Sequence, residues 1–346
     1  MSREQGPETP TVEEPDRAEG GEPGGGGRLT RALLAFGNRL IAWVRRRHAN
    51  RSPRTERILL VLAVLLFIVV TWLGFRTMPD VGRPVRWGVV ALAAAVGVPL
   101  STLLNAFEYR LSGKILGHRI ALLEAIRVSV LASAANRLPI PGAALVRIGA
   151  LRRLGSGFGK ATTATAAVGI VWTGTSFATA GVLQCVAARW ILGLTFLGGG
   201  LAGIGLGYAL MVWRARPARA VRLTAELLLI ELAAVALPTV KMLVVLQAIG
   251  FDVTVAQSAA LAVSIVVAHA TGFFPGGLGL REVIAGAMSP LVGLPVSVGL
   301  LGTAVTRAFS LVMSLLIAAI VLIPYLRGKK ASAAAEAVGP PVPHDD

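Results

Sequence analysis

The chain has 346 residues and a formal net charge of +16. Its composition is 54% hydrophobic and 15% charged with a mean hydropathy of +0.70, whereas globular proteins carry about 25% charged residues. A water-soluble globular protein is therefore excluded. Long uncharged runs, without the alternating pattern of membrane strands, predict an all-α polytopic membrane protein and exclude a β-barrel.

The first part of the chain changes character twice. Residues 1–27 are acidic and rich in Gly and Pro, so they bury too little apolar surface to offset their ordering entropy, and we expect a disordered tail. Residues 28–57 are rich in arginine, with apolar residues at helical spacing and Trp43 among them. This pattern predicts a basic amphipathic helix on an anionic membrane surface, or a solvated charge run that only sets the topology. We expect no nucleic-acid partner.

Six apolar runs are long enough to cross a bilayer core of about 30 Å, which takes about 20 helical residues. They cover residues 58–75, 87–107, 161–183, 190–213, 223–249 and 296–326. We therefore expect a membrane domain over residues 58–326 and a disordered C-terminal tail over residues 327–346.

Two further apolar segments are interrupted at their centres. Because basic loops flank the first on both sides, we predict that it enters and leaves from the cytoplasm as a re-entrant hairpin, and that the second does so from outside. The order span, span, re-entrant, span then occurs twice, which indicates an inverted repeat. Eight ordinary spans with proline kinks are the alternative. The segments and their breaks are 120–148 with Pro139, Pro141 and Gly142, and 253–294 with Pro275, Gly276, Gly277 and Gly279.

The distribution of Lys and Arg among the short loops predicts the orientation. Basic loops mark the cytoplasmic side of a membrane protein. The basic N-terminal region, the loop 214–222 and the tail after residue 326 then lie inside, together with both termini. The loops at 76–86, around Cys185 and around Asp252 remain for the outside. We expect a multi-pass protein of the cell membrane.

No residue pattern in the sequence indicates catalysis. A single cysteine, Cys185, excludes an internal disulfide and a cysteine-based metal site, and the four histidines lack metal-ligand spacing. Nucleotide-binding and hydrolase motifs are also missing. We therefore expect no cofactor, no metal and no catalytic residue. Gly199, Gly203 and Gly207 form a stripe that predicts close helix packing.

The charged residues inside the apolar segments are the candidate site residues, since such charges are costly in a membrane and are usually paired or functional. The half-helices after the two breaks begin beside Arg137 and Arg281, and a helix N-terminus attracts anions. Guanidinium groups bind phosphate with two parallel hydrogen bonds. We predict an anion site with Glu282 orienting the arginines, although Arg281 and Glu282 could instead only anchor the hairpin. The candidates for anion binding are Asn136, Arg137, Arg147, Arg281, Glu282 and Arg307, and those for proton coupling are Glu231, His269 and Lys241.

Several short motifs resemble the flippase-like transmembrane family, which is the membrane region of lysylphosphatidylglycerol synthases. The residues that carry the resemblance are Pro275-Gly276-Gly277-Leu278-Gly279-Leu280-Arg281-Glu282, Gly293-Leu294-Pro295, Arg307, Asn136 with Pro139, Leu145-Val146-Arg147 and Arg152-Arg153. The resemblance covers roughly residues 58–326.

That resemblance implies a protein that binds or translocates an anionic lipid, either a phospholipid or a polyprenyl-phosphate-linked one. We expect no soluble aminoacyltransferase domain after residue 326, so the membrane region would stand alone. The alternative is a non-transporting membrane partner or scaffold for a separately encoded lipid synthase or glycosyltransferase.

The single thiol provides a test of the orientation. We predict that Cys185 lies on the external side, because basic loops near Lys160 and Arg214 hold the other ends of its two flanking spans inside. A membrane-impermeant maleimide should modify it in intact cells. Modification only after the membrane has been opened would reverse the predicted orientation of every span.

Overall fold

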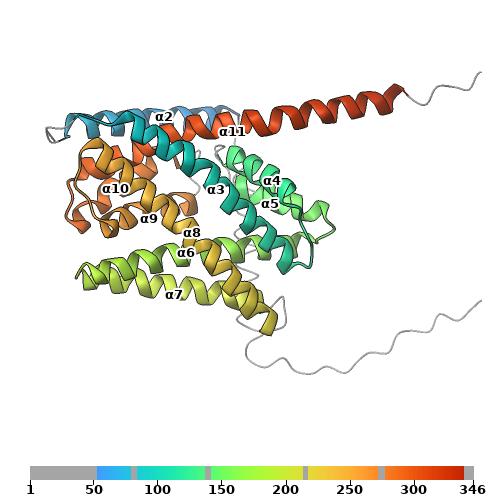
Figure 1. The fold of residues 1–346 in the computed structure, drawn as a ribbon, viewed down its shortest axis with the longest axis horizontal. Coiled ribbons are helices and arrows are strands. Elements are labelled where there is room, and N and C mark those ends of the chain that lie inside the picture. Colours follow the sequence, from blue (N-terminus) through green and yellow to red (C-terminus); the bar gives the residue numbers. More distant parts are fainter. Residues whose placement is uncertain (1–52, 79–83, 137–141, 213–216, 272–276, 339–346) are drawn as a thin grey trace, which may run out of the picture. The chain divides into compact units, whose positions relative to one another are not determined.

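A computed structural model describes residues 53–78, 84–136, 142–212, 217–271 and 277–338 (Figure 1). All regular structure in these residues is helical. The elements are α2 (Pro53–Arg76), α3 (Trp87–Ile115), α4 (Leu122–Ala135), α5 (Gly142–Arg153), α6 (Phe158–Val186), α7 (Trp190–Val212), α8 (Pro217–Ile249), α9 (Val255–Thr271), α10 (Leu280–Met288), a 3-10 turn (Pro290–Val292) and α11 (Val296–Val338). The tail predicted for residues 1–27 and most of the basic segment 28–57 lie outside the described residues.

Five of these helices, α3, α6, α7, α8 and α11, are long and apolar enough to cross a membrane. The first predicted span, 58–75, lies in α2, whose apolar part Leu60–Arg76 is shorter. Large apolar side chains point outward from the long helices, including Ile191 (87% exposed), Leu229 (71%) and Ile320 (72%). Contiguous apolar surface of this kind is unfavourable in water and favourable against lipid. The fold therefore fits a multi-pass membrane protein.

The last helix is longer than the sequence analysis predicted. We expected a disordered tail from residue 327, but α11 continues as a helix to Val338. The added residues include an alanine-rich stretch with high helix propensity. Extending an existing helix also avoids the cost of nucleating a new one.

Each of the two interrupted segments forms a pair of short helices that pack against each other. The first pair, α4 and α5, has 14 and 12 residues, or about 21 and 18 Å of helix; the second pair, α9 and α10, has 17 and 9 residues, or about 26 and 14 Å. All four helices are shorter than the bilayer core of about 30 Å. The predicted breaks at Pro139, Pro141, Pro275 and Gly276 lie outside the described residues.

The described residues that follow each break include glycines that no other residue could easily replace. A Cβ on Gly142 would meet the backbone of Ala135, so the end of α4 and the start of α5 approach each other closely. Gly277 and Gly279 have φ values of +67° and +76°, a region that other residues rarely adopt. The glycines thus permit the tight approach and the abrupt start of α10.

The helices form two sets that share several corresponding contacts. In chain order, α2, α3, the α4–α5 pair and α6 are followed by α7, α8, the α9–α10 pair and α11. Contacts between α3 and α4 correspond to those between α8 and α9, those between α6 and α9 to those between α11 and α4, and those between α6 and α7 to those between α11 and α2. Helices α3 and α8 pack against each other at the centre of this arrangement.

Two apolar clusters stabilise opposite stretches of α3 and α8. The first, around Val90 and Leu246, also includes α9, α10 and α11. The second, around Leu111 and Leu227, also includes α6 and α7. The part of α3 between Val90 and Leu111 therefore lies between two apolar clusters. This part contains polar side chains, among them Asn105 and Glu108.

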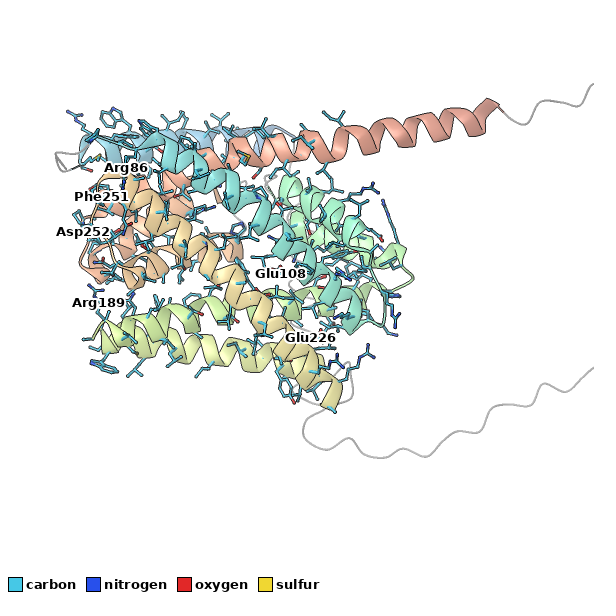
Figure 2. The ribbon with its side chains drawn as sticks, in the orientation of Figure 1. Arg86, Glu108, Arg189, Glu226, Phe251 and Asp252 are labelled. Carbon is cyan, nitrogen blue, oxygen red and sulfur yellow. The ribbon has the colours of Figure 1, made fainter. Side chains whose placement is uncertain are left out.

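Charged residues mark the ends of the long helices. Arg86, Arg189 and Asp252 lie toward one end in Figure 2, and Glu226 lies toward the opposite end. The Glu226 carboxylate pairs there with Lys114 at 2.8 Å. The three loops that we predict on the external side thus lie at the same end of the helices.

Close packing of α6 on α7 depends on glycines seven residues apart. Gly193, Gly200 and Gly207 of α7 are buried, and a Cβ on Gly200 would meet the backbone of Gly174 and Ala178 in α6. Seven residues complete nearly two helical turns, so these positions share one face.

The predicted glycine stripe is only partly correct. Gly203 and Gly207 contact α6, but Gly199 is exposed with open space around it. A spacing of four residues rotates about 40° around the helix at each step, which carries Gly199 off the contact face.

This difference predicts opposite effects of two matched substitutions. Gly200→Ala should lower the stability by about 1 to 3 kcal/mol, because its Cβ meets backbone atoms that cannot rotate away. Gly199→Ala should be neutral or stabilising by up to about 1 kcal/mol through helix propensity. Thermal unfolding of both purified variants in detergent measures the difference. Equal melting temperatures would contradict the packing of α6 on α7.

Candidate functional site

A cavity of about 380 Å³ lies among α3, α4, α5, α6, α8, α9 and α10. Asn136 and Ala143, which flank the first break, line this cavity. His269 and Arg281, which flank the second break, line it as well. Residues of the two interrupted segments, far apart in the sequence, therefore line one cavity inside the helices.

The first helix pair contributes a paired arginine. Arg147 of α5 donates to the Oε2 atom of Glu108 from both Nη1 and Nη2, each at 3.2 Å, and Nη2 also donates to the Oδ1 atom of Asn105 at 2.8 Å. Asn105 and Glu108 lie three residues apart on one face of α3. Both side chains of the ion pair are largely buried, with 13% and 8% exposed. The charge of Arg147 is therefore compensated by the protein.

The second helix pair contributes an arginine without such a partner. Arg281 of α10 forms no ion pair in the described part of the chain, and its buried Nε and Nη2 atoms have no hydrogen-bond partner there. Lys241 of α8 also lines the cavity, donates to the Oγ atom of Ser310 at 3.1 Å and repels Arg281 electrostatically. The neighbouring Glu282 attracts Arg281 electrostatically, but its carboxylate pairs with Arg307. A buried cation without an ion pair of its own is costly. This part of the cavity thus carries two cationic side chains without an ion pair in the described residues.

Lys241 and Arg147 lie at different levels along α3. The side chain of Lys241 lies beside Gly97, where a Cβ would meet its Cδ atom at 3.2 Å. Arg147 instead contacts Asn105 and Glu108. At 1.5 Å per residue these levels are about 12 to 16 Å apart along the helix axis. The cavity therefore has a paired end, where Arg147 binds Glu108, and a cationic end, where Lys241 lies.

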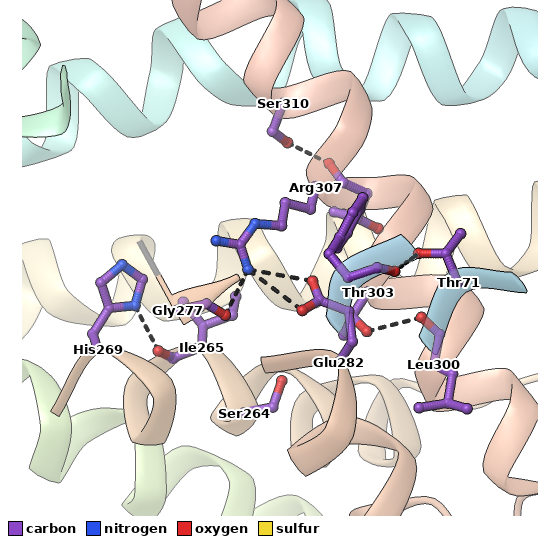
Figure 3. Close-up of polar contacts among 12 residues, drawn as sticks. Thr71, Ser264, Ile265, His269, Gly277, Glu282, Leu300, Thr303, Arg307 and Ser310 are labelled. Atoms are coloured by element: carbon purple, nitrogen blue, oxygen red, sulfur yellow. Dashed lines mark hydrogen bonds and ion pairs between the residues drawn. The ribbon is translucent and has the colours of Figure 1, made fainter. Parts of the chain in front are cut away.

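His269 faces the cavity from the end of α9. Its Nδ1 atom lies 2.6 Å from the carbonyl oxygen of Ile265, as Figure 3 shows, and its ring meets Trp172 edge-on. A carbonyl oxygen only accepts, so Nδ1 carries the proton in this contact. The ring is held by its own helix, and the residue lines the cavity.

Arg307 and Glu282, two of the predicted anion-binding residues, are not in the lining of the cavity. Arg307 donates from Nη1 to the carbonyl of Gly277 at 2.9 Å and to the carboxylate of Glu282 at 3.3 Å (Figure 3). Glu282 is fully buried. That Arg307 binds phosphate and is oriented by Glu282 stays a prediction. The pair joins α11 to the first turn of α10 and holds the second break in place.

The remaining predicted residues differ in their placement. Glu231 is fully buried, both of its carboxylate oxygens lack a hydrogen-bond partner in the described residues, and it does not line the cavity. Arg137 lies outside the described residues. Proton coupling by Glu231, His269 or Lys241 stays a prediction.

Sequence reasoning missed Glu108 and Asn105. Glu108 directly follows the uncharged run 87–107, at which the predicted span ends. The structure instead has α3 continuing to Ile115, so Glu108 lies inside the helix and is buried. The spacing Asn105-x-x-Glu108, which places two polar groups on one helical face, was the available signal.

Neither a family model, nor a curated protein, nor a solved structure matches this chain. The features that bear on function are therefore those of the cavity itself. It lies between two interrupted segments, and Arg281 in its lining has no ion pair in the described residues.

The ion pair between Arg307 and Glu282 predicts a specific pattern of stability. Arg307→Ala should destabilise the protein by about 3 to 5 kcal/mol, because Glu282 is left buried without its partner. Replacing both residues, as Arg307→Met with Glu282→Leu, should restore most of that loss. Unfolding in detergent measures the stability. A double variant as unstable as Arg307→Ala would mean that the arginine acts through other contacts.

Proposed function

We propose that the protein binds an anionic lipid and translocates it across the cell membrane. The observation that carries this proposal is Arg281, a guanidinium group without an ion-pair partner in the described residues, in a cavity that also contains Lys241. An anionic headgroup supplies the missing counter-charge and accepts hydrogen bonds from the free nitrogen atoms.

The architecture supports the same proposal. We propose that α4–α5 and α9–α10 are re-entrant hairpins entering from opposite faces, with α2, α3, α6, α7, α8 and α11 as the six spans and both termini cytoplasmic. The four short helices are too short to cross a bilayer, and residues that flank both breaks line one cavity. Inverted repeats with broken helices at a central site are typical of transporters that alternate their access.

A lipid fits the cavity better than a water-soluble anion for two reasons. The cavity of about 380 Å³ has room for a polar headgroup, and the acyl chains can extend among apolar helices. Those helices present large exposed apolar side chains, as Leu229 and Ile191 illustrate. The resemblance to the flippase-like family points to the same class of ligand. A scaffold without a ligand would have no need of an uncompensated buried arginine.

Removing the charge of Arg281 provides the test. Arg281→Gln should weaken the binding of an anionic phospholipid by at least about tenfold, since a hydrogen bond to a charged group is worth about 1.5 to 3 kcal/mol. Arg222→Gln is the matched control, because Arg222 is 84% exposed and pairs with Glu226 outside the cavity. Native mass spectrometry measures bound lipid, and dithionite quenching of a labelled lipid in proteoliposomes measures translocation.

Three outcomes of these assays separate the possibilities. Undiminished binding and translocation by Arg281→Gln would contradict the site. Wild-type binding without translocation would favour a lipid-presenting partner protein. Full displacement of the lipid by inorganic phosphate or glycerol phosphate at equal concentration would identify a soluble anion as the ligand.

A further inference from the structure

The two ends of the cavity differ in their chemistry, and this difference identifies the class of headgroup. Resting on the function proposed above, we propose that the ligand is a phosphodiester lipid whose headgroup carries hydroxyl groups and no amine. The cationic end binds the phosphate, and hydrogen-bonding side chains of the first helix pair bind the hydroxyl groups.

The phosphate position follows from the location of uncompensated charge. Arg281 and Lys241 both line the cavity and repel each other. Neither forms an ion pair in the described residues, in contrast to Arg147, whose two Nη atoms bind Glu108. A phosphodiester bound between Arg281 and Lys241 removes the repulsion, whereas at Arg147 it would compete with a carboxylate already in place.

The hydroxyl-binding position lies on one face of α4. Ser129, Ser133 and Asn136 occupy positions i, i+4 and i+7, so they share a face, and all three line the cavity. The Oγ atom of Ser129 is buried and has no hydrogen-bond partner in the described residues. Serine and asparagine both donate and accept, as recognition of a hydroxyl group requires. A ligand with hydroxyl groups satisfies the unpartnered Ser129.

An amine-bearing headgroup has no matching partner in the cavity. Among the described residues of the lining, Glu108 is the only acidic one, and it already pairs with Arg147. Glu231 has unpartnered oxygens but is fully buried and outside the lining. An ammonium group would therefore meet Arg281 and Lys241 without an opposing carboxylate. The cavity disfavours zwitterionic and aminoacylated lipids.

The same ligand would join the two helix pairs. Its phosphate contacts α10, and its hydroxyl groups contact α4. Because these elements belong to the two sets of helices, a bound headgroup couples the sets. A lipid without hydroxyl groups would engage only the second set.

Three lipids with identical acyl chains and headgroups of similar size test the inference. Phosphatidylglycerol carries hydroxyl groups, phosphatidylethanol carries neither a hydroxyl nor an amine, and phosphatidylethanolamine carries an amine. Competition for the purified full-length protein, measured by native mass spectrometry, should rank phosphatidylglycerol above phosphatidylethanol by about tenfold, the equivalent of one hydrogen bond of about 1.4 kcal/mol. Phosphatidylethanolamine should rank last.

A double variant, Ser129→Ala with Asn136→Ala, should lower phosphatidylglycerol binding to the level of phosphatidylethanol and leave phosphatidylethanol binding unchanged. Ser314→Ala is the matched control, because Ser314 donates within α11 and lies outside the cavity lining. Melting temperatures establish that the variants fold. The ranking of lipids by the wild-type protein decides the inference even where a variant does not fold.

Different results would overturn the selection of the headgroup and the binding of anionic lipid. Equal binding of phosphatidylglycerol and phosphatidylethanol, an unchanged ratio in the double variant, or strong binding of phosphatidylethanolamine would overturn the headgroup selection and leave anionic lipid binding intact. Failure of the wild-type protein to bind any of the three lipids would overturn both.

Discussion

The structure depends on the requirement that a chain surrounded by lipid satisfies its own polar groups. A helix in a membrane can be interrupted only where protein surrounds the break, because lipid offers no hydrogen bonds to the freed backbone. In this protein short helices beside each break pack against long ones, and Arg307 binds both the carbonyl of Gly277 and the carboxylate of Glu282. One buried arginine thus stabilises the second break and positions α10.

The two sets of helices share several corresponding contacts but differ in how their arginines are paired. Each helix pair brings one arginine to the cavity, Arg147 from α5 and Arg281 from α10. The first meets a carboxylate on α3, and the second has Lys241 of α8 nearby. The folded chain therefore has a cavity with a neutral polar end and a cationic end.

The apolar runs and their interruption by Pro and Gly predicted much of the architecture correctly. The long apolar runs became helices, and both interrupted segments became pairs of short helices on either side of the predicted breaks. The ends of helices were less predictable. Glu108 lies inside α3 and not in a loop, and α11 continues to Val338, because an existing helix extends through residues of good propensity at little cost.

By itself the sequence determined which segments are apolar, where they break and which charged residues occur in them. These properties follow from local composition and from the cost of polar groups in lipid. The tertiary structure alone decided which charges are compensated. Arg147 finds Glu108 39 positions away, and Arg307 finds Glu282 25 positions away, through packing of separate helices. Arg281, adjacent to Glu282 in the sequence, has no ion pair in the described chain, because neighbours on a helix point in different directions.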